Sequence, residues 1–357
     1  MRLLFVAQEA FPGDQVGPRQ ALDGLLATGE IGALSIFPLL CEAKQRKSEG
    51  AALEALFDLA QTSKSDIILW QAVGSFPVGD DYLRKLRDSV SSRYLAYQDG
   101  DPWGGVHKPL SPAMKAMAKT ADLVFLCGLG PFSDLFRRAG ARRVLHWSHS
   151  VDTKRFGKTF PSAGERQFDA VMIGNLAGSR IPFLYGLPGA RRRFEAARKL
   201  GRTLGNRFAV FGKGWPDLPF ARGPIPFDQQ EVTCQQAWVT VGWDHYDRTP
   251  YYFSDRLPIA LLSGVPHVTN YQPGFEHFFP SDSGIFFAKS PDQMVDIVTH
   301  LLSRPPSERI ALGMNARRLA GDRLLAADVF GGMVRTVIRE ACSSNGIAPE
   351  MARCAHE

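Results

Sequence analysis

Short runs of β-branched and aromatic residues alternate with helical segments along the chain, and this alternation restricts the fold more than any other feature of the sequence. Each candidate strand in the first part is followed by a segment with the apolar spacing of an amphipathic helix. Parallel strands need such crossover helices, so the pattern predicts an α/β fold with a doubly wound parallel sheet. The expected strands are Arg2–Gln8, Ala33–Leu39, Asp66–Gln71, Arg93–Gln98, Asp122–Cys127 and Arg143–His146, separated by helices near 17–29, 50–61, 79–91, 110–119 and 131–139.

A polar stretch interrupts the alternation of strands and helices, which then resumes. The stretch SHSVDTKRFGKTFPSAGERQFD is punctuated by Gly and Pro and is typical of an interdomain linker. At 357 residues the chain exceeds the length at which one hydrophobic core usually stops growing. We therefore expect two Rossmann-like domains, 1–160 and 161–322, and a C-terminal segment, 323–357, that begins as a helix and ends as a frayed tail. The expected strands of the second domain are AVMIGN, RFAVFG, AWVTVGW, VPHVT and GIFFA, followed by three helical stretches from about 291 to 343.

The composition is that of a folded protein with a small excess of positive charge. Hydrophobic residues make up 45% and charged residues 22%, and the net charge of +6 suits an anionic ligand such as a phosphate. Five cysteines without a close CxxC pair argue against structural zinc or a disulfide framework. The start MRLLFVAQEAFPG has too short an apolar run for a signal peptide. We therefore expect a cytoplasmic protein without a metal site.

The loops after the strands of the first domain are candidate sites, because ligands of doubly wound sheets bind at the carboxyl ends of the strands. After the first strand, Gly13 and Gly17 let the backbone pass close to a phosphate or an acceptor and precede a helix N-terminus. The loop lacks GxGxxG, so a dinucleotide site is poorly supported, and a plain turn into a helix would use the same residues.

The fourth strand ends in YQDGDPW, which places two carboxylates at the same edge of the sheet. Asp99 and Asp101 are therefore candidates for a general base and the group that orients it, or for a pair that chelates a metal. His107 follows closely and is a candidate proton carrier. Asp-Gly-Asp is also an ordinary turn composition, and a histidine after Gly-Gly is often just solvated.

The second domain repeats the arrangement of a strand followed by a glycine turn. In MIGNLAGSRIPF an arginine can reach a phosphate, and in VFGKGW a lysine stands between two glycines directly after a strand. The segment GPIPF offers backbone groups that suit the edge of a flat base. The candidate ligand-binding residues from these loops are Gly174, Asn175, Arg180, Lys213, Gly214 and Ile225.

The stretch SDRLPIALLSGVPHVTN predicts a helix that begins just before Arg256 and feeds directly into a strand. Pro258 is tolerated in the first turn if Ser254 or Asp255 is the N-cap, and Gly264 is typical of a left-handed helix end. A cation in the first turn opposes the helix dipole unless an anion binds there. A diphosphate would remove that penalty, and a local pair between Arg256 and Asp255 is the simpler alternative.

Three of these segments, in this order and spacing, resemble the donor half of GT-B glycosyltransferases of the CgeB-like, glycosyl-transferases-group-1 branch. They are VMIGNLAGSRIPF, FAVFGKGW and SDRLPIALLSGVPHVTNYQPGFEHFFP. The resemblance covers about 165–320, whereas ADLVFLCGLGPFSDLFRRAGARRVLHWSHSVDTKRF is similar only in pattern to the end of the acceptor domain and the linker. In such enzymes the last helix often crosses back to the first domain, and GGMVRTVIREAC is the candidate.

The resemblance implies a glycosyltransferase in which two domains face each other across a cleft. The second domain would bind a nucleotide-diphospho-sugar such as a UDP-sugar, and the first would hold the acceptor. No cofactor would be required, although the two aspartates keep a divalent metal possible. The residues that would line the diphosphate pocket are Arg180, Lys213, Arg256 and the backbone at Ser254 and Asp255, while Ile225 would flank the base.

One departure from the family concerns Ile259, where related enzymes commonly have the glutamate that holds the donor ribose. Two alternatives therefore stay open: a GT-B-shaped sugar-nucleotide epimerase, and a degenerate domain that binds nucleotide without transfer. The expected acceptor is a glycan, a lipid-linked molecule or another small molecule of polysaccharide or glycoconjugate biosynthesis. Nucleic acid is a poorer partner, because the basic run ARRRFEAARKLGR is expected to form a solvated helix face, which could also touch an anionic membrane.

Overall fold

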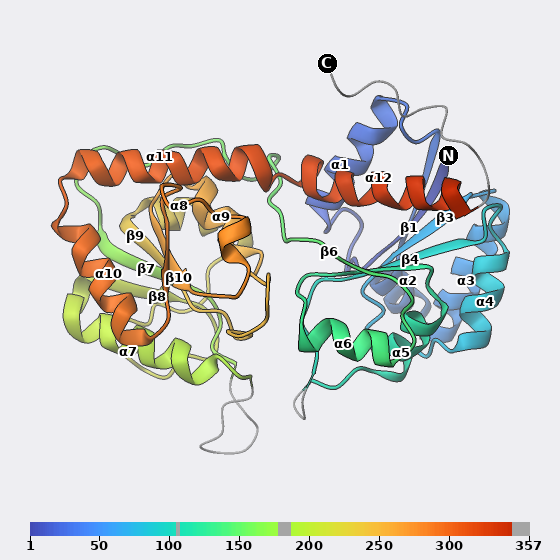
Figure 1. Ribbon diagram of the computed structural model, residues 1–357, viewed down its shortest axis with the longest axis horizontal. Coiled ribbons are helices and arrows are strands. Elements are labelled where there is room, and N and C mark those ends of the chain that lie inside the picture. The colour runs from blue at the N-terminus through green and yellow to red at the C-terminus, as the bar shows by residue number, and fades with distance from the viewer. Residues whose placement is uncertain (105–107, 178–186, 345–357) are drawn as a thin grey trace. The chain divides into compact units, whose positions relative to one another are not determined.

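The structure, a computed structural model, describes residues 1–104, 108–177 and 187–344 (Figure 1). Its contacts divide the chain into unit 1, Met1–Trp147 with Ala326–Glu357, and unit 2, Ser148–Leu325. Unit 2 begins before the expected boundary at residue 160, because Val151 and Phe156 are buried in its core. None of the helices in the described ranges combines the length and the apolar character that crossing a membrane requires.

Unit 1 contains a six-stranded sheet in which all pairs are parallel, which confirms the predicted doubly wound arrangement (Figure 1). The strand order is β2-β1-β3-β4-β5-β6, so the order reverses between β1 and β3. In such sheets ligands bind outside the carboxyl ends of the strands at this switch point. The strands are β1 (Arg2–Ala7), β2 (Ala33–Pro38), β3 (Ile67–Gln71), β4 (Tyr94–Asp99), β5 (Leu123–Leu126) and β6 (Val144–His146).

The helices of unit 1 follow the predicted segments, with one addition. The helix α2 was not expected, because it follows β2 without a break and the stretch through Leu39 was interpreted as one strand. A left-handed Lys47 ends α2, and the Ser48 hydroxyl caps the next helix by accepting from the amide of Ala51. The helices are α1 (Val16–Ala27), α2 (Leu39–Arg46), α3 (Glu49–Thr62), α4 (Asp80–Asp88), α5 (Pro112–Thr120), α6 (Pro131–Arg138) and α12 (Ala326–Ser344).

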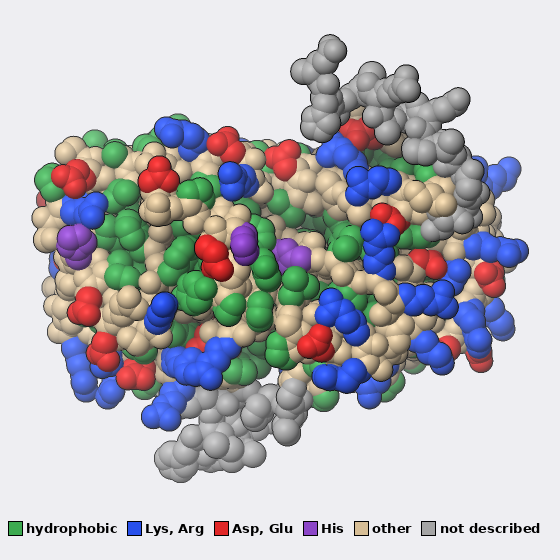
Figure 2. Space-filling model, viewed as in Figure 1, with side chains coloured by type: hydrophobic (Ala, Val, Ile, Leu, Met, Phe, Trp, Pro, Cys, Tyr) green, Lys and Arg blue, Asp and Glu red, His purple; other side chains and the backbone are tan. Residues whose placement is uncertain are grey.

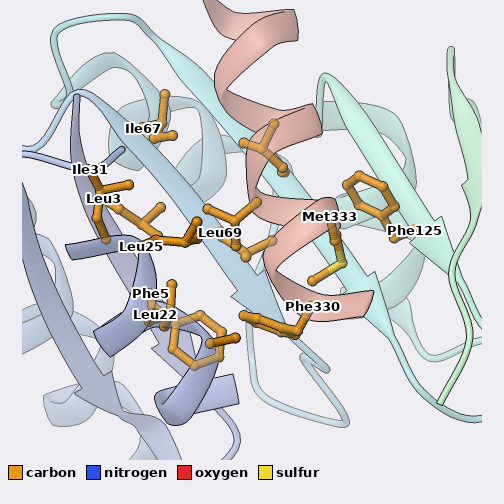
Figure 3. Packing of buried hydrophobic residues seen from close by; sticks show 14 of the residues in the cluster. Leu3, Phe5, Leu22, Leu25, Ile31, Ile67, Leu69, Phe125, Phe330 and Met333 are labelled. Atoms are coloured by element: carbon orange, nitrogen blue, oxygen red, sulfur yellow. The ribbon is translucent and has the colours of Figure 1, made fainter. Parts of the chain in front are cut away.

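The last helix, α12, completes the core of unit 1. Phe330 and Met333 of α12 pack against Phe5 and Leu69 of the sheet and against Leu22 of α1 (Figure 3). The rings of Phe5 and Phe330 meet edge to face with their centroids 5.5 Å apart. Burial of side chains of this size stabilises by about 1.5–3 kcal/mol each, so β1 depends on residues more than 300 positions away in the sequence.

Unit 2 contains a five-stranded parallel sheet in the order β11-β10-β9-β7-β8, which again confirms the predicted arrangement. Its switch point lies between β7 and β9. The elements are β7 (Phe168–Ile173), α7 (Ala190–Leu204), η1 (Gly205–Arg207), β8 (Phe208–Phe211), η2 (Phe227–Gln229), α8 (Gln230–Gln235), β9 (Ala237–Gly242), α9 (Arg256–Leu262), β10 (His267–Asn270), η3 (Phe275–His277), β11 (Ile285–Ala288), α10 (Pro291–Ser303) and α11 (Pro306–Arg323).

Two apolar clusters show how the helices of unit 2 cover its sheet. One contains Ala197 of α7 and Val298 of α10, together with Val239 of β9. The other contains Leu261 of α9 and Leu319 of α11. The polar residues described next lie near the carboxyl ends of β7, β9 and β10.

Candidate functional site

A pocket lies at the switch point of unit 2. It is lined by the last residues of β7 and β9, Ile173 and Gly242, and it continues beneath α8 and α9. The side chains of Arg193, Asp244 and Arg256 line it too. The fold therefore brings two arginines from different helices, α7 and α9, to the place where doubly wound sheets bind their ligands.

The two arginines converge on the backbone of Gly174, the first residue after β7. A Cβ atom built on Gly174 would lie 3.4 Å from Nη1 of Arg193 and 3.6 Å from Nε of Arg256. Glycine therefore allows both guanidinium groups to approach the main chain at this point. Two like charges this close repel each other, and an anion placed between them would remove the repulsion.

Arg193 is only 3% exposed. It donates from Nε to the carbonyl of Trp243 and from Nη1 to the carbonyl of Asn175. Burial, with Arg256 nearby, lowers the pKa of Arg193 to about 9, so the group stays charged at neutral pH. A buried cation held by neutral carbonyls beside a second cation is a strong anion-binding arrangement.

The expectation that the basic run ARRRFEAARKLGR forms only a solvated face was wrong for Arg193. Positions Ala190, Arg193, Ala197 and Leu200 are all buried and recur at helical spacing, so Arg193 belongs to the buried stripe of α7. This spacing was the signal in the sequence that could have identified it. Other cations of the run are paired with carboxylates, as in Arg192 Nη1 with Asp247 Oδ2 at 2.8 Å.

His245 bridges the arginine and the loop after β7. Its Nδ1 lies 3.4 Å from Nη1 of Arg193, and its Nε2 accepts from the amide of Ala177 at 3.3 Å. Burial, together with the charges of Arg193 and Arg256, lowers the pKa of His245 to about 2. The imidazole is therefore neutral at any physiological pH and adds hydrogen-bonding capacity without adding charge. His245 was not among the residues expected from the sequence.

The loops after β7 and β8 are locked to each other. The amide of Lys213 donates to Oδ1 of Asn175, and the amide of Leu176 donates to the carbonyl of Lys213, both at 2.8 Å. Trp215 Nε1 donates to the carbonyl of Gly174 at 2.8 Å. The predicted residues Gly174, Asn175, Lys213 and Gly214 therefore lie together, with the Lys213 side chain exposed at the edge of the site.

Substitution of Gly214 should break this lock. Gly214 has φ +80°, and a Cβ there would overlap the carbonyl oxygen of Leu176. Gly223→Ala is the matched control, because Gly223 has φ +77° but open space around it. Left-handed strain alone costs about 1 kcal/mol, so Gly223→Ala should lose about that much stability and Gly214→Ala clearly more. Urea unfolding of both variants measures the difference, and equal losses would show that the close approach is unimportant.

The stretch SDRLPIALLSG forms the predicted helix. Helix α9 begins at Arg256, with Asp255 at the N-cap, and Gly264 follows its end in the left-handed region with φ +77°. The Asp255 side chain makes no capping bond, and Nη1 of Arg256 lies 3.6 Å from its Oδ1. Ser254 is buried and lines the pocket. The local pair weighed above is thus present, but it is long and partly exposed and leaves Arg256 directed at Gly174.

The second domain contains three further residues that the sequence singled out. Ile259 lines the pocket from α9 and is buried in the core of unit 2. Ile225 is half-buried in the loop before η2, and it is absent from the described residues that line the pocket. Arg180 lies outside the described residues. His267 was not predicted; it lines the same pocket, its Nδ1 lies 2.9 Å from Oγ1 of Thr240, and burial lowers its pKa to about 3.

In unit 1, Asp99 ends β4 as predicted but is buried, with 2% of its surface exposed. Its Oδ2 accepts from the hydroxyl of Tyr97 at 2.6 Å, and its Oδ1 accepts from the amide of Asp101 and from Trp103 Nε1, both at 3.1 Å. Burial raises the pKa of Asp99 from 3.8 to about 6, against the effect of these bonds. Asp99 therefore orders the loop that follows β4.

Asp101, by contrast, is exposed at the start of that loop. Lys108 Nζ donates to its Oδ2 at 2.9 Å and also lies 4.3 Å from the centre of the Trp103 ring. The two predicted carboxylates thus differ in their surroundings. Asp99 is buried and holds the residues that follow it, whereas Asp101 is accessible. His107 lies outside the described residues. Among the described residues, no group of three His, Cys, Asp or Glu side chains could hold a metal ion.

The glycine loop after β1 is occupied by a side chain of the protein itself. Glu9 accepts from the amides of Gly13 and Gln15, both at 3.2 Å, and forms a two-pronged pair with Arg19. Although burial acts the other way, these donors lower the pKa of Glu9 below its ordinary value. Gly17 is buried inside α1. The amides of Gly13 and Gln15 already donate to Glu9, so the loop has little hydrogen-bonding capacity left for a phosphate.

Comparison with known proteins places these features in context. Residues 191–326 match the protein family described as Glycosyl transferase-like. The chain is similar to the crystal structure of Anabaena HepE in complex with UDP and glucose, with 14% identity, a TM-score of 0.59, and coverage of 95% of this chain and 99% of that one. No curated protein matches the chain.

Two further solved structures are similar over nearly their full lengths. A UDP-forming α,α-trehalose-phosphate synthase from Burkholderia xenovorans has 14% identity, a TM-score of 0.60, and coverage of 96% of this chain and 99% of that one. Sucrose-phosphate synthase from Thermosynechococcus elongatus has 12% identity, a TM-score of 0.59, and coverage of 96% and 100%. At this level of identity the likeness shows the fold, which is GT-B, with two Rossmann-like units.

Proposed function

We propose that the protein is a glycosyltransferase that transfers a sugar from a nucleoside-diphosphate sugar to an acceptor hydroxyl. The observation that carries the proposal is the convergence of Arg193 and Arg256 on Gly174 at the switch point of unit 2. The match of residues 191–326 to a glycosyl transferase-like family supports it, since that segment contains both arginines.

The chemistry of the reaction suits this arrangement. Cleavage of the bond between sugar and phosphate leaves negative charge on the departing diphosphate, and fixed cations at that point lower the barrier. Arg193 is already oriented by the carbonyls of Trp243 and Asn175, so little reorganisation is needed when charge develops. In this proposal the two guanidinium groups neutralise the leaving group in place of a metal ion or other cofactor.

The acceptor would be activated by residues of unit 1. Asp101, which is exposed, is proposed as the general base that takes the proton of the acceptor hydroxyl. Asp99 is proposed as a positioning residue, because its carboxylate holds the amide of Asp101 and the indole of Trp103. Both assignments keep Asp99, which ends β4, and Asp101, which follows it, at the centre of the acceptor side of the reaction.

The donor is proposed to be a UDP-sugar. Anabaena HepE, to which the chain is similar, has been crystallised with UDP, with UDP-glucose, and with UDP and glucose. The motifs of residues 165–320 further suggest the CgeB-like branch, with an acceptor from polysaccharide or glycoconjugate biosynthesis. A thermal-shift screen of UDP, GDP, ADP and CMP and their sugars tests the choice of nucleotide.

Replacement of Arg256 by alanine tests the diphosphate site. One charge-assisted hydrogen bond contributes more than about 1 kcal/mol, so the variant should bind UDP roughly tenfold more weakly in calorimetry. Arg198→Ala is the matched control, because Arg198 is an exposed arginine of α7 outside the pocket. Its UDP affinity should equal that of the wild type. Unchanged affinity of Arg256→Ala would remove this residue from the site.

Turnover separates sugar transfer from its alternatives. The protein should release UDP from a UDP-sugar in the presence of a suitable acceptor and form a glycosylated product that mass spectrometry detects. Conversion of the labelled donor to its epimer without an acceptor would instead indicate an epimerase. UDP binding without turnover across a broad panel of acceptors would contradict the transferase proposal and indicate a domain that only binds nucleotide.

A further inference from the structure

Unit 1 contains a cavity that the proposed donor site does not use. Its volume is about 460 Å³, and it is lined by Gly104, by the two residues Pro109 and Leu110 before α5, and by residues of α5 and α6 and the position after α6. Cavities of roughly 300–1,000 Å³ are the size that proteins use for small ligands. The carboxylate of Asp101 accepts from Lys108, which directly precedes Pro109 of the cavity lining.

The floor of the cavity is apolar. Pro109 and Leu110 contribute from the loop, and Leu135 and Ala139 contribute from α6 and the residue that follows it. Gly104 completes this floor. A Cβ there would lie 3.2 Å from Cδ1 of Leu135, so glycine lets the backbone pack closely against the leucine. An apolar chain placed here would gain stability from the surface it removes from water.

The other side chains that line the cavity are cationic. Lys115 extends from α5 and Arg138 from the end of α6. Both residues are exposed, and within the described part of the chain neither side chain has a hydrogen bond or an ion pair. Figure 2 shows lysine and arginine side chains over the part of the surface where α5 and α6 lie. Two uncommitted cations beside one cavity favour a ligand that carries more than one negative charge.

We propose that this cavity binds an amphipathic phosphate monoester, with the alkyl chain on the apolar floor and the phosphate between Lys115 and Arg138. Arginine offers a planar pair of donors to phosphate oxygens, and lysine adds a mobile point charge. A free phosphate would leave the floor empty, and an uncharged amphiphile would leave both cations unpaired. The proposal concerns binding and does not depend on sugar transfer.

Octyl phosphate, used below its micelle concentration, tests the proposal in calorimetry with the full-length protein. It should bind the wild type at least tenfold more tightly than inorganic phosphate and at least tenfold more tightly than octyl glucoside. Lys115→Glu combined with Arg138→Glu should weaken octyl phosphate at least tenfold, and the corresponding pair of glutamine substitutions should weaken it less. Lys85→Glu on α4 is the matched control, because Lys85 is an exposed lysine that does not line the cavity.

Each outcome decides the proposal. Equal binding of octyl phosphate by the double glutamate variant and the wild type would overturn it. If inorganic phosphate bound as tightly as octyl phosphate, the cavity would be a site for phosphate alone. If octyl glucoside bound as tightly as octyl phosphate, the cavity would bind apolar chains without using its charge. Either result would also overturn the proposal. UDP affinity, which reports on unit 2, should stay unchanged in every variant, so loss of the donor site and loss of this site are distinguishable.

Discussion

The variant Arg193→Met should lose at least about 100-fold in affinity for UDP, which corresponds to about 3 kcal/mol. Methionine keeps much of the length of the side chain but removes the charge and the donors. Truncating a buried, hydrogen-bonded cation that contacts an anion costs about 2–5 kcal/mol, more than a partly exposed cation such as Arg256 contributes. Calorimetry with UDP measures the loss directly.

The stability of the same variant without nucleotide should change little. Methionine leaves the carbonyls of Trp243 and Asn175 without their donor, which destabilises the fold. Methionine also removes a buried charge and its repulsion with Arg256, which stabilises the fold. These are the same two effects that lower the pKa of Arg193 to about 9. The two effects oppose each other, so the net change in the free energy of unfolding should be small.

Arg191→Met provides the control for this experiment. Arg191 is an exposed residue of the same helix and does not line the pocket. Its UDP affinity and melting temperature should match those of the wild type. An affinity of Arg193→Met within threefold of the wild type would show that the buried guanidinium does not contact the diphosphate, and the proposed donor site would then be wrong.

The variant Asp99→Asn should be more stable than the wild type at pH 7.5 by up to about 3 kcal/mol. The folded-state pKa of Asp99 is raised from 3.8 to about 6 by burial. Such a group contributes stability that is fully present below pH 3.8 and is lost as the pH rises through about 6. A shift of this size amounts to about 3 kcal/mol, and an asparagine does not incur the loss because it does not ionise.

Urea unfolding at several pH values between 4 and 8 measures this effect. The wild-type free energy of unfolding should contain a component that falls across this range, and in Asp99→Asn that component should be missing. Asp101→Asn is the matched control, because the Asp101 carboxylate is exposed and its pair with Lys108 contributes less than about 1 kcal/mol. Identical pH profiles for Asp99→Asn and the wild type would show that Asp99 is not buried in its charged form.

Turnover should fall in both aspartate variants while UDP affinity stays the same. The loss should be larger for Asp101→Asn, about 10²–10⁴-fold, because a general base contributes that much. Asp99→Asn should act indirectly, through the loop that holds Asp101 and Trp103. If both variants retain the full rate, the base lies elsewhere in the protein.

Local patterns in the sequence were sufficient for much of the fold. The 11 strands of the two sheets follow runs recognisable from β-branched and aromatic residues, and the start of α9 at Arg256 follows from Ser254, Asp255 and Pro258. These features depend on neighbours within a few residues, so they can be read without the tertiary structure. Helix α2 was missed because it follows β2 directly, with Pro38 both ending the strand and preceding the first residue of the helix.

The candidate site was only partly accessible from the sequence. Arg256 and the glycine loops stood out because an unusual residue occupied a recognisable position, such as a cation in the first turn of a helix. Arg193 was hidden in a basic run, and His245 had no motif around it. The occupation of the Gly13 loop by Glu9 and Arg19 was equally invisible, since their pairing depends on how α1 folds back on the strand end.

The sequence by itself determined the order of strands and helices, the two Rossmann-like units and the position of the helix that begins at Arg256, because periodicity and turn chemistry act over short distances along the chain. Only the tertiary structure decided which charges are buried and which meet. Arg193 and Arg256 are 63 positions apart, yet both approach Gly174, because the strand order places the ends of β7 and β9 side by side. Burial and electrostatic interactions depend on distance in space, and a linear pattern does not contain that distance.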